Sequence, residues 1–163
     1  MMMSGLRAAV ILTSLIAVDG SAWAETWRSY VNDRFGASVE YPDRFSVHDA
    51  PPANSDGQRF HTADRRATLA VFGFLNVLDE TSKQIMEGRK NAGMQYTLAS
   101  AHAGAFTLSG RKGDRIAYLR CLRSRAAKDI WVCADLEYPA AERQAFDPIV
   151  TRIAGSLRAG KPW

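Results

Sequence analysis

A segment that is apolar at nearly every position, Ala67–Leu75 (ATLAVFGFL), places the strongest constraint on how this chain can fold. A strand of this kind has no polar side to present to water, so it belongs in a sheet that is covered on both faces. It follows the short stretch Arg59–Thr62 across residues 63–66, and this spacing predicts a hairpin. We therefore expect a sheet that lies between two covering layers.

The rest of the chain predicts further antiparallel strands and a helix. A helix is expected over 81–94, because Thr81 and Gln84 fit a capping box and Gly93 is a suitable end. The Ser109–Asp114 segment is glycine-rich and basic, but it lacks the strand-to-helix setting of a phosphate-binding loop and is read as a hairpin turn. The other expected strands are 35–41, 95–100, 105–109, 115–123 and 129–138.

The C-terminal segment predicts the clearest amphipathic helix. Asp147 and Pro148 look like its N-cap and first residue, and 140–145 is expected to form a separate short turn. The fold class is therefore α+β: a single-domain α/β/α sandwich with a largely antiparallel central sheet and a C-terminal amphipathic helix. The apolar positions that repeat with helical spacing are Phe146, Ile149, Val150, Ile153, Ala154 and Leu157.

The N-terminus has the pattern of a secretory signal peptide. A short segment with one positive charge, Met1–Arg7, precedes the apolar run 8–18, and Ala22-Trp23-Ala24 supplies the small residues of a cleavage site before Glu25. The run is shorter than the ~20 residues of a membrane-spanning helix. We expect a signal peptide at 1–24 and one exported domain at 25–163, periplasmic or secreted, with no transmembrane anchor in the mature protein.

The chain contains two cysteines, Cys121 and Cys133. Export to an oxidising compartment favours a disulfide between them. If the hairpin of strands 115–123 and 129–138 turns near Ala127, the two residues lie directly opposite each other, at a separation that a disulfide can bridge. The alternative is a redox pair, which usually has a much closer spacing.

The net charge and the known catalytic and cofactor motifs limit the classes of function to be considered for this chain. The formal net charge is +4, which suits an anionic envelope component or an envelope protein complex as a partner, whereas the absence of a dense basic run argues against nucleic acid. The nucleophile-elbow, zinc-protease, P-loop and Rossmann patterns are missing, so no catalytic residue, metal ligand or cofactor is assigned. The three histidines, His48, His61 and His102, do not have the spacing of a metal site.

The most suggestive local cluster follows the loop 48–58, which is rich in proline and turn residues. Asp56, Arg59 and His61 place an acid, a cation and an imidazole beside it, and loops on a rigid sheet often carry binding sites. The alternative is structural, with Asp56 in a turn and Arg59 in solvent. Trp131 lies between Ile130 and Val132 in an alternating strand, so its side chain faces the other side of the sheet from theirs. It either packs under a helix or, if that face is exposed, contacts a partner.

Two stretches of aromatic, glycine, proline and apolar residues form a pattern that is found in a known fold. They are Tyr30, Phe35, Gly36, Val39, Tyr41, Pro42 and Phe45, then Tyr138-Pro139, Phe146, Ile149, Ile153 and Leu157. Together they resemble the PsbP/Mog-type α/β/α sandwich and small exported bacterial proteins with the same layout. This resemblance covers most of residues 27–158 and implies a docking module, since PsbP-like proteins are non-catalytic extrinsic subunits and Mog-type proteins bind a small GTPase. No residue of this chain matches a known contact residue of either group.

Two functions follow as hypotheses. The first is a non-enzymatic binding or accessory protein of the bacterial cell envelope, with an exposed groove or patch beside the 48–58 loop. The alternative is a small exported hydrolase or metal-dependent enzyme, in which His48, His61 or His102 would meet carboxylates in one pocket.

Overall fold

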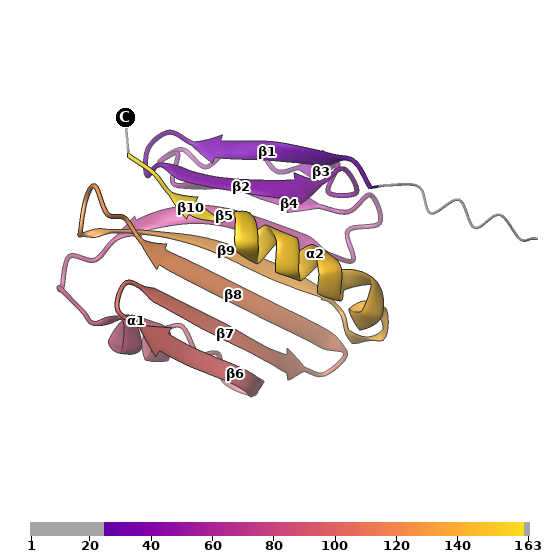
Figure 1. Ribbon diagram of the computed structural model, residues 1–163. Coiled ribbons are helices and arrows are strands. Elements are labelled where there is room, and N and C mark those ends of the chain that lie inside the picture. The colour runs from indigo at the N-terminus through magenta and orange to yellow at the C-terminus, as the bar shows by residue number, and fades with distance from the viewer. Residues whose placement is uncertain (1–24, 162–163) are drawn as a thin grey trace, which may run out of the picture.

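The structure is a computed structural model that describes residues 25–161; the expected signal peptide at 1–24 lies outside the described residues. Within 25–161 the strands form two sheets, and every pairing is antiparallel. The large sheet has the order β3-β4-β5-β9-β8-β7-β6, and the small sheet has the order β1-β2-β10 (Figure 1). The elements are β1 (Trp27–Asn32), β2 (Ala37–Pro42), β3 (Val47–His48), β4 (Gly57–His61), β5 (Thr68–Leu75), α1 (Ser82–Gly88), β6 (Gln95–His102), β7 (Ala105–Lys112), β8 (Arg115–Arg123), β9 (Ile130–Pro139), the 3-10 turn η1 (Ala140–Glu142), α2 (Arg143–Ser156) and β10 (Arg158–Ala159).

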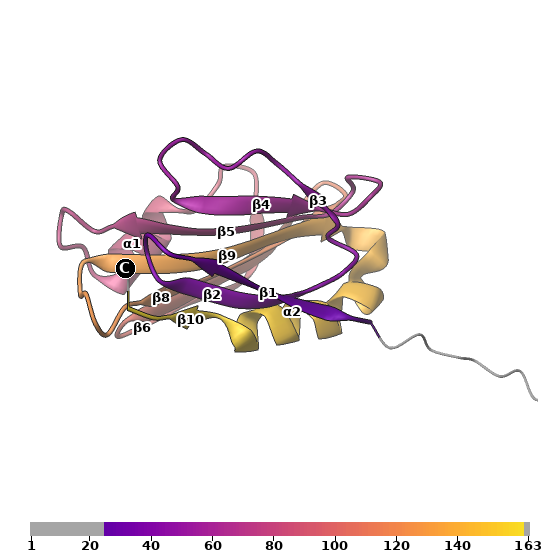
Figure 2. The same cartoon turned by 90° about the horizontal axis from the view of Figure 1, so that it is seen from above.

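The large sheet is covered on both faces, as its apolar strands predict. The first face packs against α2 and the small sheet, whereas the second face carries α1, and the loop that joins β3 to β4 projects on the side away from α2 (Figure 2). The α/β/α arrangement and the α+β class are therefore confirmed.

Strands β5 and β9 show why two covering layers are required. Val71 and Val132 point into the larger core cluster on the first face, and Trp131 and Cys133 point into a second cluster beneath α1. All four side chains are buried. Burial on both sides removes apolar area from water at roughly 25 cal/mol per Å², which is the main stabilising contribution to the fold.

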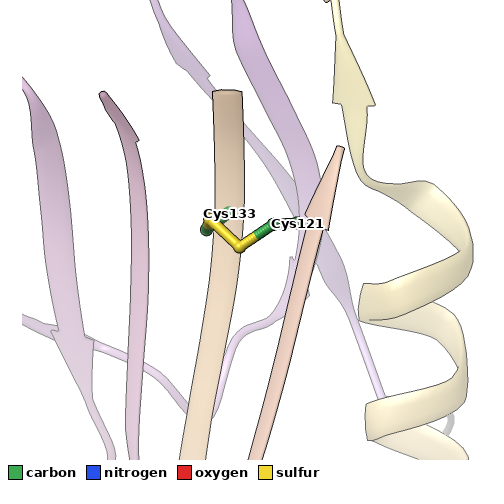
Figure 3. Close-up of a disulfide and its surroundings, with 2 residues drawn as sticks. All are labelled: Cys121 and Cys133. Atoms are coloured by element: carbon green, nitrogen blue, oxygen red, sulfur yellow. A yellow bond between two sulfur atoms is a disulfide. The ribbon is translucent and has the colours of Figure 1, made fainter. Parts of the chain in front are cut away.

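The expected disulfide is confirmed at the expected register. Cys121 of β8 lies directly opposite Cys133 of β9, with the two Cα atoms 4.1 Å apart (Figure 3). Both residues have 0% of their surface exposed, in a cluster with Ile85 and Met86 of α1. The bond therefore fixes the register of two central strands beneath the helix.

The first helix begins where the sequence predicts but ends early. Thr81 and Gln84 form the capping box, yet α1 stops at Gly88 rather than near Gly93. The backbone N–H of Asn91 donates to the Tyr96 hydroxyl at 2.7 Å, so the chain has already turned towards β6. A contact from another element therefore overrides the local helix signal.

The C-terminal helix begins earlier than predicted, and the assignment of Asp147 and Pro148 as its N-cap and first residue is wrong. Helix α2 starts at Arg143, and Pro148 lies inside it. Phe146 is buried and stacks on Tyr138 with ring centroids 4.6 Å apart. Proline removes only one backbone hydrogen bond there, and this packing offsets the loss.

Three strands that the sequence analysis did not assign, β1, β3 and β10, complete the fold. β1 pairs with the whole of β2, and β10 pairs with the other edge of β2, where the Gly160 N–H donates to the Gly36 carbonyl at 2.7 Å. Gly36 has a φ of 69° and lies so close to this backbone that a Cβ atom would clash with it.

Reduction of the Cys121–Cys133 bond is expected to lower the stability of the folded protein. A loop of this length contributes ~3 kcal/mol in the chain-entropy model, which corresponds to a fall of roughly 10 °C in Tm. Differential scanning calorimetry with and without a reductant measures this. A Cys121→Ala/Cys133→Ala variant is the control, because its Tm should not respond to the reductant; an unchanged Tm in the reduced natural protein would contradict the expectation.

Candidate functional site

Two adjoining hollows lie on the second face of the large sheet and share Asp135 and Phe72. One, of about 450 Å³, lies beside the loop 49–56, which is shorter than the expected loop 48–58 because β3 and β4 take up its ends, and it includes Arg59. The other, of about 210 Å³, lies towards α1 and β6 and includes Arg89 and Tyr96. We call the two together the Asp135 groove.

Strand register explains why the groove is open at this point. Arg59 of β4 pairs with Ala70 of β5, which in turn pairs with Asp135 of β9. These residues share one face of the sheet, because directly opposed residues point the same way. The small side chain of Ala70 therefore leaves space between a guanidinium and a carboxylate.

Asp135 is a half-buried carboxylate to which the structure gives neither a hydrogen bond nor an ion pair within residues 25–161. Burial raises its pKa from 3.8 to about 6, the Glu137 charge adds to this rise, and the charges of Arg59 and Arg89 oppose it. An unpaired carboxylate in such a place is costly.

Arg89 follows α1 and lies over the aromatic side chains of β5. Its guanidinium carbon is 4.3 Å from the ring centroid of Phe74 and 5.6 Å from that of Phe72. Burial lowers its pKa, and the charge of Asp135 acts in the opposite direction. Within the described chain, the side chains of Arg89 and Arg59 form no hydrogen bond or ion pair with protein groups, so their donors are available to a ligand.

The structure brings Asp56, Arg59 and His61 to one region. Asp56 and Arg59 both line the groove. His61 lies two residues beyond Arg59 on β4, and its Nε2 atom is 3.0 Å from Oδ1 of Asp49, a groove residue. The cluster expected from the sequence is therefore contiguous in space.

His61 also contacts a hydroxyl. Its Nδ1 atom is 3.1 Å from Oγ1 of Thr68, so Asp49, His61 and Thr68 form a chain of polar contacts. Contact with His61 is the main cause that lowers the pKa of Asp49. Nε2 is buried, and its approach to Asp49 does not have the geometry of a hydrogen bond.

The other named residues lie elsewhere. Trp131 is 1% exposed beneath α1, where it packs on Phe106 with ring centroids 5.6 Å apart. His48 packs edge-on against Phe60, and Nε2 of His102 is 3.0 Å from the Ser100 hydroxyl. Over residues 25–161, no group of three or more histidines, cysteines or carboxylates is arranged to hold a metal ion.

The sequence analysis missed Asp135, Arg89 and Tyr96. A signal for Asp135 was present, because it falls in the same alternation as Trp131 and Cys133 and therefore points to a covered face. No sequence pattern indicated that Arg89 would line the groove, since its position depends on where α1 ends.

The solved structures with this fold include the following two. Cyanobacterial PsbP (CyanoP) from Synechocystis superimposes with a TM-score of 0.62 and 16% sequence identity, over 88% of this chain and 98% of that chain. The Ran-binding protein Mog1p from Saccharomyces cerevisiae superimposes with a TM-score of 0.55 and 9% identity, over 83% of this chain and 96% of that one. No protein-family model and no curated protein sequence matches the chain.

Among residues 25–161, no helix is both long enough and apolar enough to cross a membrane.

The structural matches confirm the resemblance that the sequence motifs suggested, at the level of the fold. The chain thus has the PsbP/Mog-type α/β/α sandwich fold.

Proposed function

We propose that the protein is exported to the bacterial cell envelope and acts there as a non-enzymatic binding or accessory protein through the Asp135 groove. The observation that carries the proposal is the half-buried, unpaired carboxylate of Asp135, which lines the groove together with the unpaired guanidiniums of Arg59 and Arg89. Unpaired charges in such an arrangement do not stabilise the fold, whereas a ligand can pair with all three groups.

The charges in the groove favour a ligand, or a partner segment, that carries both signs. A cationic group fits against the carboxylate of Asp135, and an anionic group fits the guanidinium of Arg59 or Arg89. The ring of Tyr96 and the side chain of Phe72 supply an apolar wall between them. Small zwitterions, such as amino acids and peptide fragments of the cell wall, have this combination.

The fold is compatible with a binding role. Mog1p, which shares it, is a Ran-binding protein. Because fold does not determine function, this similarity only adds to the argument from Asp135. The envelope location rests on the signal-peptide pattern and on the buried disulfide, which suits an oxidising compartment.

The alternative function, a small exported hydrolase, rests on the polar chain Asp49–His61–Thr68. A histidine between a carboxylate and a hydroxyl is the pattern of nucleophilic catalysis. Hydrolysis of chromogenic ester, peptide or phosphate substrates that His61→Ala abolishes would establish this alternative in place of the binding role. Turnover at the level of buffer alone would reject it.

Replacement of Asp135 by asparagine is expected to stabilise the folded protein at pH 7.5. The carboxyl ionises near pH 6 in the folded protein but near 3.8 in the unfolded chain. The natural protein therefore loses stability as the pH rises through this window, by on the order of 3 kcal/mol in total. Urea unfolding at pH 7.5 and at pH 3.5 measures the difference, which should nearly vanish at the lower pH.

Asp129→Asn is the matched control, because Asp129 is exposed in the turn between β8 and β9. Its free energy of unfolding should change by less than about 0.5 kcal/mol at either pH. An Asp135→Asn variant that is less stable than the natural protein at pH 7.5 would mean that Asp135 has an internal partner.

Ligand binding is expected to raise Tm in a thermal-shift screen of amino acids, short peptides and cell-wall peptide fragments. A ligand at 100 times its Kd adds ~2.7 kcal/mol, or several degrees. Arg59→Ala and Asp135→Asn should remove the shift, whereas Arg66→Ala should retain it, because Arg66 pairs with Glu142 outside the groove. Shifts that survive both groove substitutions would refute the proposed site.

A further inference from the structure

A separate hollow on the first face of the large sheet is lined by basic residues and by no carboxylate. It has a volume of about 950 Å³ and lies between β8, the C-terminal end of α2, β10 and the turns at 103–104 and 124–129. We call it the basic groove. It shares no residue with the Asp135 groove. Its cationic residues are Arg120, Arg123, Arg125, Lys128 and Arg158.

Neutral acceptors hold several of these side chains in place. Nη1 of Arg120 donates to Oγ1 of Thr107 at 3.3 Å, and Nε of Arg123 donates to the carbonyl of Lys128. Nη1 of Arg158 donates to two carbonyls at the end of α2, at 2.7 and 2.9 Å. Each guanidinium has five N–H donors, so most of them stay free while the side chain is already oriented.

None of the five cations forms an ion pair within the described chain, although many cations elsewhere do. Arg28 pairs with Asp43, and Arg115 pairs with Glu137 at 2.8 Å. The nearby carboxylate of Asp129 does not line the basic groove. The positive charge of this hollow is therefore not neutralised, and a concave surface with one sign of charge concentrates oppositely charged ligands.

We propose that the basic groove binds a polyanionic chain whose negative charges are phosphate groups. Guanidinium forks bind phosphate oxygens in pairs, and four of the five cations are arginines. Protein interfaces depend on exposed aromatic or large apolar anchors. The apolar lining here is alanine with Leu122 and the buried Leu157, so a flexible polymer fits better than a folded protein. Its concave form also suits a chain better than a flat membrane.

The test is the binding of fluorescently labelled inorganic polyphosphate to the purified protein, followed by anisotropy over a series of salt concentrations. The variant Arg120→Gln/Arg125→Gln/Lys128→Gln should bind about tenfold or more weakly than the natural protein. The slope of log K against log salt should become shallower by roughly 2, because each cation contributes about 0.7 on a single-stranded polyanion.

The matched control is Arg28→Gln/Arg65→Gln/Arg143→Gln, which removes the same charge from exposed side chains that already form ion pairs. It should weaken binding less than threefold. Equal weakening by both variants would overturn the proposal, because net charge alone would then explain binding. Polyglutamate that binds as tightly as polyphosphate, or binding to phosphatidylglycerol vesicles without binding to polyphosphate, would overturn it as well.

Backbone amide shifts of the natural protein provide a test that does not depend on variants. Polyphosphate should shift the resonances of Gly104 and Gly155, which line the basic groove, and should leave those of Gly57 in the Asp135 groove unchanged. Shifts confined to Gly57 would overturn the proposal. Since the two grooves share no residue, failure here leaves the proposed function of the Asp135 groove intact, and the reverse also holds.

Discussion

The burial of β9 on both faces is the constraint on which the rest of the molecule depends. Val132 and Leu136 pack towards α2 and the small sheet, whereas Trp131 and Cys133 pack beneath α1. A slip of one residue would exchange these two sets of side chains and expose both. The bond between Cys121 and Cys133 joins β9 to β8 at one register, so it holds both layers in place.

The same alternation places a carboxylate where a core residue is expected. Asp135 follows Cys133 on the second face, but α1 ends too early to cover it, and Ala70 leaves space beside it. The result is a half-buried carboxylate whose pKa is raised by its surroundings, so that its ionisation is unfavourable in the folded protein. Sites that bind ligands often keep such groups, because the bound ligand offsets part of the free energy that the unpaired group costs the unliganded protein.

The two faces of the molecule differ in charge. The Asp135 groove combines carboxylates with guanidiniums, and the basic groove has cations alone. The formal charge of +4 is therefore a poor guide to the electrostatic potential at any one place on the surface. Charges in ion pairs cancel each other, whereas the basic groove contains several unpaired cations. A ligand that carries both signs and a ligand that carries only negative charge are thus recognised at different places.

The sequence by itself determined the layers, the disulfide and the start of α1. The pattern of Ala67–Leu75 requires two covered faces, and the cysteine spacing matches a hairpin register, since these are local consequences of alternation. Tertiary structure decided the helix ends, the pairing of β1 and β10 with β2, and both grooves. Arg59, Arg89 and Asp135 come from three separate elements, and only strand order and register bring them together. The basic groove likewise gathers cations of β8, β10 and a turn that are dispersed in the sequence, because packing in space, and not proximity in the chain, sets the local potential.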